Sequence, residues 1–347
     1  MKIVVLAGGT STERDISIVS GTGICRALRS RGHQAILIDV FCGAAQTDVD
    51  QAFSEDYDVD EAVSYIKSFN PSLPELIRGR KSFWGPKVLS LCEAADIVFL
   101  ALHGKNGEDG RVQATFDLMG IPYTGAGYLS SGMAMDKAIT KKLFWQQGVP
   151  TPRGFSFSRQ DPFQYPDQHD MDFPVVVKTC CGGSSVGVYI VHQRQEYENA
   201  LKLAFGYEEF VVVEEYIKGR EYTMAVVNGK AYPIVEIAPK EGFYDYKNKY
   251  QPGSTVEICP APLEEETADT MTRIALDAYR ALDLEAYARF DFILNDKGKI
   301  YCLEANTLPG MTPTSLIPQE AEALGMDYAD LCEELMRVSS RRCVWKD

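Results

Sequence analysis

The stretch RFDFILNDKGKIYCLEAN, residues 289–306, alternates polar and apolar side chains on both sides of a short polar segment. Successive side chains of a β-strand point to opposite faces, so Arg289 and Asp291 share one face and the intervening phenylalanine takes the other. The segment 295–298, NDKG, is typical of a turn. The pattern therefore predicts a β-hairpin with one polar face and one apolar face.

The returning strand places Cys302, Glu304 and Asn306 on one predicted face. With a four-residue loop, Arg289 would oppose Glu304 and Asp291 would oppose Cys302, so that the two carboxylates lean into one space. Carboxylate and amide oxygens suit Mg²⁺, which combines a few protein ligands with substrate phosphates. The hairpin thus predicts a site that holds nucleotide phosphates through divalent ions, the alternative being a solvated face with a surface salt bridge.

Length and charge narrow the class of protein. A chain of 347 residues is too long for one ordinary core and predicts two or three domains. A net charge of −14 argues against nucleic-acid binding, which needs a basic face. No apolar run approaches the ~20 residues that span a bilayer, and the N-terminus lacks a signal-peptide pattern, so neither a membrane nor secretion is expected.

Nine cysteines without paired metal spacing indicate reduced thiols, and hence a cytoplasmic protein. The adjacent Cys180 and Cys181 have two interpretations. They could be small buried residues beside a strand, or they could form a redox switch.

The N-terminal third has the pattern of an open parallel α/β sheet. An apolar run at 2–7, a glycine turn at 8–11, a periodic helix at 16–28 and a strand at 35–40 form a right-handed parallel unit. Another buried strand is expected at 97–102, and residues 43–90 are expected to form a helical excursion. Ligands bind beyond the carboxyl ends of such strands, where the glycine loops 8–11 and 104–110 lie.

The rest of the chain predicts an α+β arrangement of hairpins and a few helices. Asn228-Gly229 is a strong hairpin signal between strands 222–227 and 230–236. Further strands are expected at 174–178, 188–191 and 210–216, and helices at 137–147, 264–282 and 327–338.

Several residues before the hairpin could frame a triphosphate. The loop GGSSVG at 182–187 offers backbone N–H groups to phosphates, although no Lys-Ser/Thr follows it as in a Walker A loop. Lys137 and Lys178 would supply positive charge, the alternative for each being an ordinary surface lysine. The backbone around Glu214 could contact an adenine edge, and Glu221 could accept the ribose hydroxyls.

Together these motifs resemble the ATP-grasp ligases, and within them the D-alanine–D-alanine ligase family. The resemblance runs over almost the whole chain. It is carried by LAGGTSTERDISIVSG (6–21), ALHGKNGEDGRVQ (101–113), GIPYTGAG (120–127), AMDKAITK (134–141), VVVKTCCGGSSVG (175–187), FYDYKNKY (243–250), ARFDFIL (288–294) and LEANTLPGMTPTSLIP (303–318).

The resemblance implies an N-terminal α/β substrate domain (1–125), a central ATP-grasp subdomain (126–213) and a C-terminal ATP-grasp domain (214–347). It also implies that ATP phosphorylates the carboxylate of one D-alanine and that the amine of a second attacks the acyl phosphate. The product would be D-alanyl-D-alanine for peptidoglycan precursor synthesis. The implied requirements are ATP and two Mg²⁺ or Mn²⁺ ions, with K⁺ activation left open, and the implied assembly is a homodimer.

The resemblance also implies a role for each matching residue. Glu13 would bind the first ammonium group near His103, Arg289 and the Gly310 backbone would stabilise the oxyanion, and Ser315 and Leu316 would meet the second substrate. Lys249 would contact the γ-phosphate, and Tyr250 would be hydrogen-bonded to Ser184 and Glu13. The implied ATP contacts are Lys137, Lys178, Ser185, Glu214, Glu215, Ile217 and Glu221, and the implied metal ligands are Asp291, Glu304 and Asn306.

Alternatives remain at this level. Tyr250 favours D-alanine as the second substrate, but D-serine, D-lactate or a non-catalytic ATP sensor stay open. Glu13 could simply favour a helix N-terminus, and His103 could be an ordinary loop histidine. Residues 241–254 have the composition of a closing loop, since an acyl phosphate must be kept from water. Thr179-Cys180-Cys181 departs from the family pattern and affects the expected shape of the phosphate loop.

Overall fold

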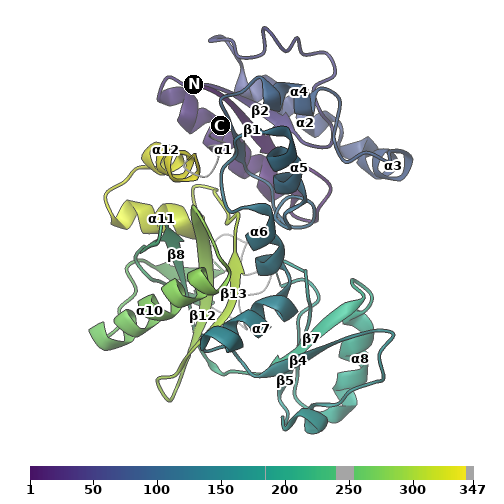
Figure 1. The fold of residues 1–347 in the computed structure, drawn as a ribbon, viewed down its shortest axis with the longest axis vertical. Helices are drawn as coiled ribbons and strands as arrows, with labels where there is room; N and C mark the ends of the chain where they lie inside the picture. Colours follow the sequence, from purple (N-terminus) through teal and green to yellow (C-terminus); the bar gives the residue numbers. More distant parts are fainter. Residues whose placement is uncertain (184, 240–253, 341–347) are drawn as a thin grey trace.

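The computed structural model describes residues 1–183, 185–239 and 254–340, which form three β-sheets with helices packed on them (Figure 1). The first sheet is parallel, in the order β2-β1-β3, from β1 (Lys2–Ala7), β2 (Gln34–Asp39) and β3 (Ile97–Leu100). α1 (Arg14–Ser30) connects β1 to β2. The strands are almost fully buried because helices and loops cover both faces.

The predicted excursion at 43–90 is helical in its second half. It contains α2 (Val59–Ser68), the short 3₁₀ helix η1 (Asn70–Ser72), α3 (Leu73–Gly79) and α4 (Val88–Glu93). α5 (Arg111–Met119) and α6 (Tyr128–Met135), which the pattern did not predict, then lead out of this part of the molecule toward the other sheets (Figure 1).

The second sheet is antiparallel, in the order β4-β7-β5-β6. Its strands are β4 (Gly154–Ser158), β5 (Val175–Thr179), β6 (Tyr189–Val191) and β7 (Phe210–Glu215). α7 (Lys137–Gln147) precedes the sheet with the predicted limits, and its C-cap Gly148 has a positive φ. α8 (Arg194–Ala204) packs on β5 and β6, and η2 (Pro166–His169) is a short 3₁₀ turn.

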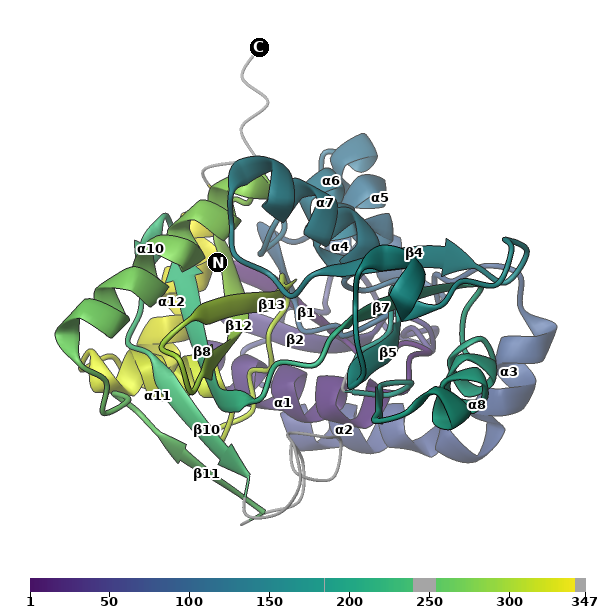
Figure 2. The ribbon, with the colours of Figure 1, turned by 90° about the horizontal axis from the view of Figure 1, so that it is seen from below.

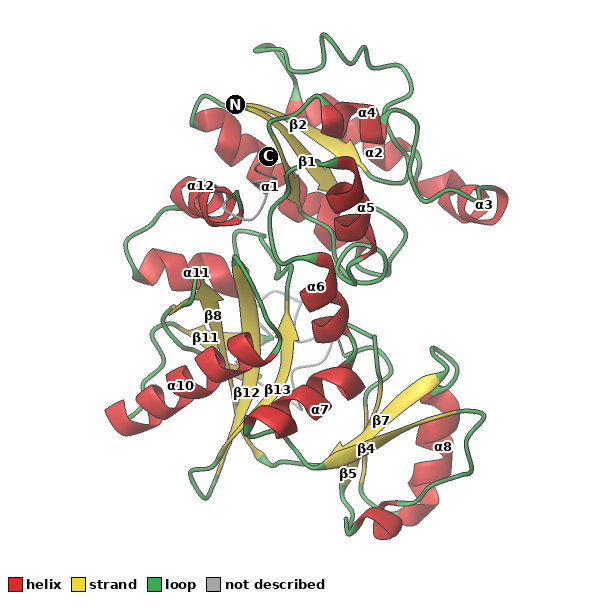
Figure 3. Ribbon diagram, viewed as in Figure 1, coloured by secondary structure: helices red, strands yellow, loops and turns green. Residues whose placement is uncertain are grey.

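The third sheet follows the order β11-β10-β8-β12-β13, with β9 paired to β8. Its strands are β8 (Gly219–Val227), β9 (Lys230–Ala231), β10 (Val235–Pro239), β11 (Thr255–Ile258), β12 (Tyr287–Asn295) and β13 (Ile300–Asn306). α10 (Glu265–Ala281), α11 (Leu316–Ala323) and α12 (Tyr328–Ser339) complete the chain, and Figure 3 shows α10 beside β12.

The predicted fold class, a parallel N-terminal sheet followed by antiparallel α+β parts, is confirmed. Figure 2 shows the sheet that contains β5 and β7 on the opposite side of the molecule's middle from β12 and β13. The predicted domain limits stay predictions, although the three sheets occupy separate stretches of the chain. Among the described residues, no helix has the length and apolar character needed to cross a membrane.

The predicted register of the 289–306 hairpin is wrong by one residue near the turn and by two residues at Asp291 and Arg289. Asp291 pairs with Glu304, but Phe292 pairs with Cys302, so a bulge adds one residue to β13. Cys302 therefore turns into the apolar core with Phe290 and Phe292, and does not share the face of Glu304. The bulge brings the two carboxylate residues directly opposite each other, where the four-residue loop predicted a diagonal.

The predicted hairpin 222–227/230–236 is interrupted after two residues of its second strand. The backbone N–H of Tyr232 still donates to the Ala225 carbonyl at 2.8 Å, but no strand residue accepts from the Ala225 N–H. That N–H donates instead to Glu320 Oε2 of α11 at 2.7 Å. Glu320 is fully buried, and burial raises the pKa of its carboxyl to about 8.

Replacing Glu320 should change how stability depends on pH. The pKa of this carboxyl is raised from its ordinary value of 4.5 to about 8, so its contribution to stability is full below pH 4.5 and is lost as pH rises through 8. Glu320→Gln keeps an acceptor oxygen without a charge. Its melting temperature should therefore fall less than that of the wild type between pH 5 and pH 9.

Glu320→Leu should lower the melting temperature at both pH values, because it leaves a buried N–H unpaired at a cost of about 1–3 kcal/mol. The exposed Glu322→Gln on the same helix is the matched control and should follow the wild type. Parallel pH curves for Glu320→Gln and the wild type would contradict this role.

Candidate active site

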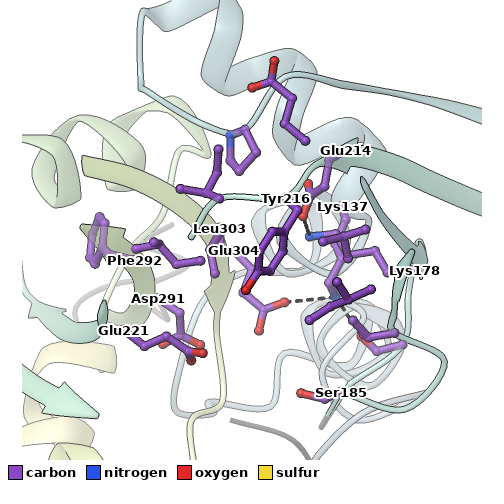
Figure 4. Close-up of a pocket in the computed structure, with 18 of the residues that line it drawn as sticks. Lys137, Lys178, Ser185, Glu214, Tyr216, Glu221, Asp291, Phe292, Leu303 and Glu304 are labelled. Atoms are coloured by element: carbon purple, nitrogen blue, oxygen red, sulfur yellow. Dashed lines mark hydrogen bonds and ion pairs between the residues drawn. The ribbon is translucent and has the colours of Figure 1, made fainter. Parts of the chain in front are cut away.

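A cavity lies between the two antiparallel sheets, and all seven predicted ATP-contact residues line it (Figure 4). The seven are Lys137, Lys178, Ser185, Glu214, Glu215, Ile217 and Glu221. Asp291 and Glu304 line it from β12 and β13. Apolar side chains of Val176, Ile190 and Leu303 complete the wall, as expected for a pocket that takes a flat base.

Lys137 reaches the cavity from the first turn of α7. The Asp136 side chain caps this helix by accepting from the N–H groups of Ala138 and Ile139, which fixes the direction of the first turn. Lys137 Nζ lies 3.1 Å from Glu304 Oε2 and donates to the Gly182 carbonyl at 2.7 Å. Burial opposes the charge of Lys137, but Glu304 outweighs it and the pKa of the ammonium is raised. Lys137 thus joins the 289–306 hairpin to the glycine loop.

Asp291 is the centre of a hydrogen-bonded group on the polar face of the hairpin. Arg289 donates to both of its oxygens at 2.9 Å, and Asn306 Nδ2 donates to Oδ2 at 3.1 Å. The hydroxyl of Thr223, which is the register partner of Asp291 on β8, donates to Oδ1 at 2.7 Å. These bonds fix the orientation of the carboxylate before any ligand enters.

The donor set fits divalent metal ions in chemistry. Asp291 and Glu304 are carboxylates on directly opposed positions, and Asn306 donates through its amide nitrogen, so its oxygen is the atom that would bind a metal. Over residues 1–183, 185–239 and 254–340, no three His, Cys, Asp or Glu side chains gather at metal-binding spacing. Each carboxylate is instead paired with a protein cation, so bound phosphates would have to complete the metal coordination.

A second cavity adjoins the first, and Glu304 and Gly183 line both. The predicted substrate and oxyanion residues line this second cavity: Glu13, His103, Arg289, Gly310, Ser315 and Leu316. They come from four separate stretches of the chain, which the fold brings together. Asn306 also lines it, so the polar face of the hairpin is the wall between the two cavities.

His103 is buried, and its ring orientation fixes its tautomer. Its Nδ1 lies 3.0 Å from the Leu308 carbonyl, so Nδ1 carries the hydrogen and Nε2 is an acceptor. Nε2 is buried without a hydrogen-bond partner. Burial lowers the pKa of the imidazole despite the nearby Glu13 carboxylate, which favours the neutral ring. His103 therefore offers an acceptor that a substrate ammonium group can use.

Glu108 is a second carboxylate in this cavity that the sequence pattern did not single out. It accepts the N–H groups of Gly104 at 3.1 Å and Leu308 at 3.2 Å. Burial, reinforced by Glu13, raises the pKa of Glu108 to about 7. Since His103 holds the Leu308 carbonyl, both backbone groups of Leu308 are tied to the 103–108 loop. These two hydrogen bonds fix the position of the backbone two residues before Gly310.

The N-terminus of α11 opens toward the second cavity at Ser315 and Leu316, its first residues. Ser315 is the N-cap residue, and its Oγ accepts from the Thr312 N–H at 3.0 Å. A helix N-terminus presents unpaired N–H groups and a partial positive charge, which suits a carboxylate. Glu13 is the N-cap residue of α1, as the helix-terminus alternative requires, and it also lines the second cavity, although its side chain makes no capping hydrogen bond.

Some predicted features lie outside the described residues, namely Ser184, Lys249, Tyr250 and nearly all of the expected closing loop. The adjacent cysteines are described. Cys180 is buried and Cys181 is exposed, and burial raises the pKa of their thiols to about 12 and about 11. Both are therefore protonated near neutral pH, which disfavours the redox-switch alternative.

Three polar residues of the site were missed at the sequence level: Lys141, Thr223 and Glu108. Lys141 follows Lys137 by four positions on a predicted helix, so helical spacing could have placed both on one face. Thr223 lies opposite Asp291 only once the order of strands β8 and β12 is known. Glu108 lies in the motif ALHGKNGEDGRVQ (101–113), but a short loop has no periodicity that predicts where a side chain points.

Comparison with known proteins agrees with this architecture. Residues 2–126 match the family model described as the D-ala D-ala ligase N-terminus, and residues 143–337 match the model of its C-terminus. D-alanine–D-alanine ligases of Lacticaseibacillus casei (strain BL23) and Pediococcus pentosaceus are 46% and 44% identical to the chain. Each alignment covers 97% of this chain and 95% or 97% of the relative.

Comparison with solved structures finds members of the same family. The D-alanine–D-alanine ligase from Bacillus anthracis complexed with ATP superimposes with a TM-score of 0.76 at 31% identity, over 99% of this chain and 98% of that one. The Coxiella burnetii ligase gives a TM-score of 0.77 at 26% identity, over 99% and 94%. The fold is that of the ATP-grasp ligases. Within them, the chain belongs to the D-alanine–D-alanine ligase family.

Thr223→Val should weaken activity while leaving the sheet intact. Valine keeps the shape of threonine but removes the hydroxyl that donates to Asp291 Oδ1. We expect kcat to fall about tenfold, since a hydrogen bond to a charged group contributes roughly 1.5–3 kcal/mol. Steady-state ADP release measures it, and Thr223→Ser, which retains the hydroxyl, is the control. Equal rates for the valine and serine variants would show that the hydroxyl does not orient Asp291.

Proposed function

We propose that this protein joins two D-alanine molecules to D-alanyl-D-alanine at the expense of ATP, forming ADP and phosphate. The observation that carries the proposal is the wall shared by the two cavities. Glu304 and Gly183 line both, so a γ-phosphate held in the first cavity would face a carboxylate held in the second. Family membership supports the same reaction.

In the first step, the carboxylate of one D-alanine attacks the γ-phosphorus of ATP. ADP leaves from that phosphorus, and D-alanyl phosphate is formed. Lys137 and Lys178 would bind the phosphate oxygens, and the backbone near Ile217 would contact the adenine edge. Both oxygens of Glu214 already face lysines, which supports backbone rather than side-chain contact at that position. Glu13 and neutral His103 would hold the ammonium group of this D-alanine.

In the second step, the amine of another D-alanine attacks the acyl carbon, and phosphate leaves after the tetrahedral intermediate collapses. Negative charge grows on the carbonyl oxygen, beside Arg289 and the Gly310 N–H. Arg289 is held in place by its two hydrogen bonds to Asp291. The carboxylate of the second D-alanine would bind at the N-terminus of α11, near Ser315 and Leu316.

Asp291, Glu304 and Asn306 would hold two Mg²⁺ or Mn²⁺ ions, which neutralise the transferring phosphoryl group when bound. Ser185 would contact the phosphates from the glycine loop, Glu221 would accept the ribose hydroxyls, and Glu215 lies beside the base site. Lys249, Tyr250 and Ser184 keep the roles implied by the resemblance. We further propose that the protein is a cytoplasmic homodimer, and we leave open whether K⁺ activates it.

Incubation with ATP, Mg²⁺ and D-alanine as the sole amino acid should release ADP with saturation. The two cavities can take the same amino acid in succession, so no second acid is required. A coupled ADP assay with product identification by mass spectrometry measures this. Turnover that appears only after D-serine or D-lactate is added would contradict D-alanine as the second substrate, and ATP binding without turnover would favour a sensor.

Glu304→Gln should reduce kcat by two orders of magnitude or more while the melting temperature changes little. The substitution keeps the size of the side chain but removes a ligand charge from the wall shared by the cavities. ADP release at saturating Mg²⁺ measures the effect, and Glu322→Gln on the surface is the control. A wild-type rate in the Glu304→Gln enzyme would refute the metal-ligand role of the hairpin.

A further inference from the structure

Lys141 is a buried lysine behind the first cavity, and it is absent from the residues that line that cavity. Its side chain is 3% exposed. It donates to Pro152 O at 2.7 Å and to Thr151 Oγ1 at 3.1 Å, and Nζ lies 2.7 Å from Glu214 Oε2. The ammonium thus makes two hydrogen bonds and one ion pair, all with protein groups, so Lys141 interacts with the protein and not with the cavity.

Glu214 is shared between Lys141 and a lysine that does line the cavity. Its other oxygen, Oε1, lies 2.5 Å from Lys178 Nζ. Glu214 and Lys178 are 5% and 8% exposed. Two ammonium groups and one carboxylate therefore form a buried cluster with one net positive charge, and Lys178 and Glu214 line the cavity while Lys141 does not.

The electrostatics of Glu214 agree with this arrangement, whereas burial lowers the pKa of the Lys141 ammonium although the Glu214 carboxylate opposes this effect. Burial opposes ionisation of Glu214, but the charges of Lys141 and Lys178 outweigh it and the pKa of the carboxyl is lowered. Glu214 thus remains a carboxylate. Without a second cation it would neutralise Lys178, and the buried pair would present no net charge to an incoming phosphate.

We propose that Lys141 is a positioning residue that acts as the counter-ion of Glu214 and so leaves the charge of Lys178 available to the phosphates of ATP. This assignment rests on the proposed use of the cavity for ATP. Glu214 orients Lys178, Lys141 balances Glu214 from outside the cavity lining, and Lys178 is the cation of the three that lines the cavity. Lys137, one helical turn before Lys141, is balanced separately by Glu304.

Lys141→Met tests the assignment, because methionine fills a similar volume without charge. We expect the KM for ATP to rise at least tenfold and the KM for D-alanine to stay within twofold. Adenosine, which has no phosphate, should bind with unchanged affinity by calorimetry. Lys142→Met removes an exposed lysine of the same helix and is the matched control, with wild-type constants expected. Equal weakening of adenosine and ATP would mean a collapsed pocket and would overturn the assignment.

The double variant Lys141→Met/Glu214→Gln separates charge balance from packing. It restores one net positive charge on Lys178, so its KM for ATP should recover to within threefold of the wild type. The glutamine amide oxygen can still accept a hydrogen bond from the Lys178 ammonium, and no buried carboxylate is left to neutralise it, so the variant remains informative if Lys141→Met alone does not fold. Losses that add in the double variant, or an unchanged KM in Lys141→Met, would contradict the counter-ion role. Wild-type enzyme that makes no ADP from D-alanine would instead contradict the proposed function.

Discussion

The bulge between β12 and β13 determines the geometry on which the rest of the site depends. It adds one residue to β13, turns Cys302 into the apolar core and leaves Asp291 and Glu304 directly opposite each other. Without the bulge, the register of Phe292 with Cys302 would continue and Asp291 would lie opposite Leu303. A bulge disrupts the hydrogen bonding between two strands at one position, and it changes the face to which the following side chains point. Here the redirected side chains form the wall between the two cavities, which we propose to hold the nucleotide and the amino acids.

Charge balance is the second constraint, because the site contains many buried ions. Glu304 is paired with Lys137, Asp291 with Arg289, and Glu214 with two lysines. Unpaired buried charges are costly, so these pairings keep the ligand-free site stable. In each pair, the cation suits a phosphate or an oxyanion, and the carboxylate suits a metal ion. Ligand binding would therefore exchange protein partners for substrate partners without leaving a charge unpaired.

The third element is the connection between the N-terminal sheet and the 307–311 segment. Leu308 packs into the N-terminal core, while Glu108 and His103 bind its N–H and carbonyl. The 103–108 loop and the backbone of Leu308, two residues before Gly310, are thus parts of one hydrogen-bonded unit, although they are about 200 positions apart in the sequence.

Alternation and glycine signals were enough to predict the parallel sheet, the limits of α7 and the polar hairpin, because these features depend on local periodicity. The family motifs correctly selected residues that line the two cavities. The bulge, the break after Ala231 and the burial of Glu320 were not predictable, since each depends on which strand or helix lies alongside. Lys141 and Thr223 were missed for the same reason, as their partners Glu214 and Asp291 are 73 and 68 positions away.

The most direct test of the shared wall is a crystal structure with Mg²⁺, a non-hydrolysable ATP analogue and D-alanine. The account predicts metal ions about 2.0–2.1 Å from oxygens of Asp291, Glu304 and Asn306, with the γ-phosphate between them and the D-alanine carboxylate. Lys137 should then contact a phosphate oxygen in place of Glu304. A γ-phosphate that lies away from β12 and β13, with Glu304 still bound only to Lys137, would contradict it.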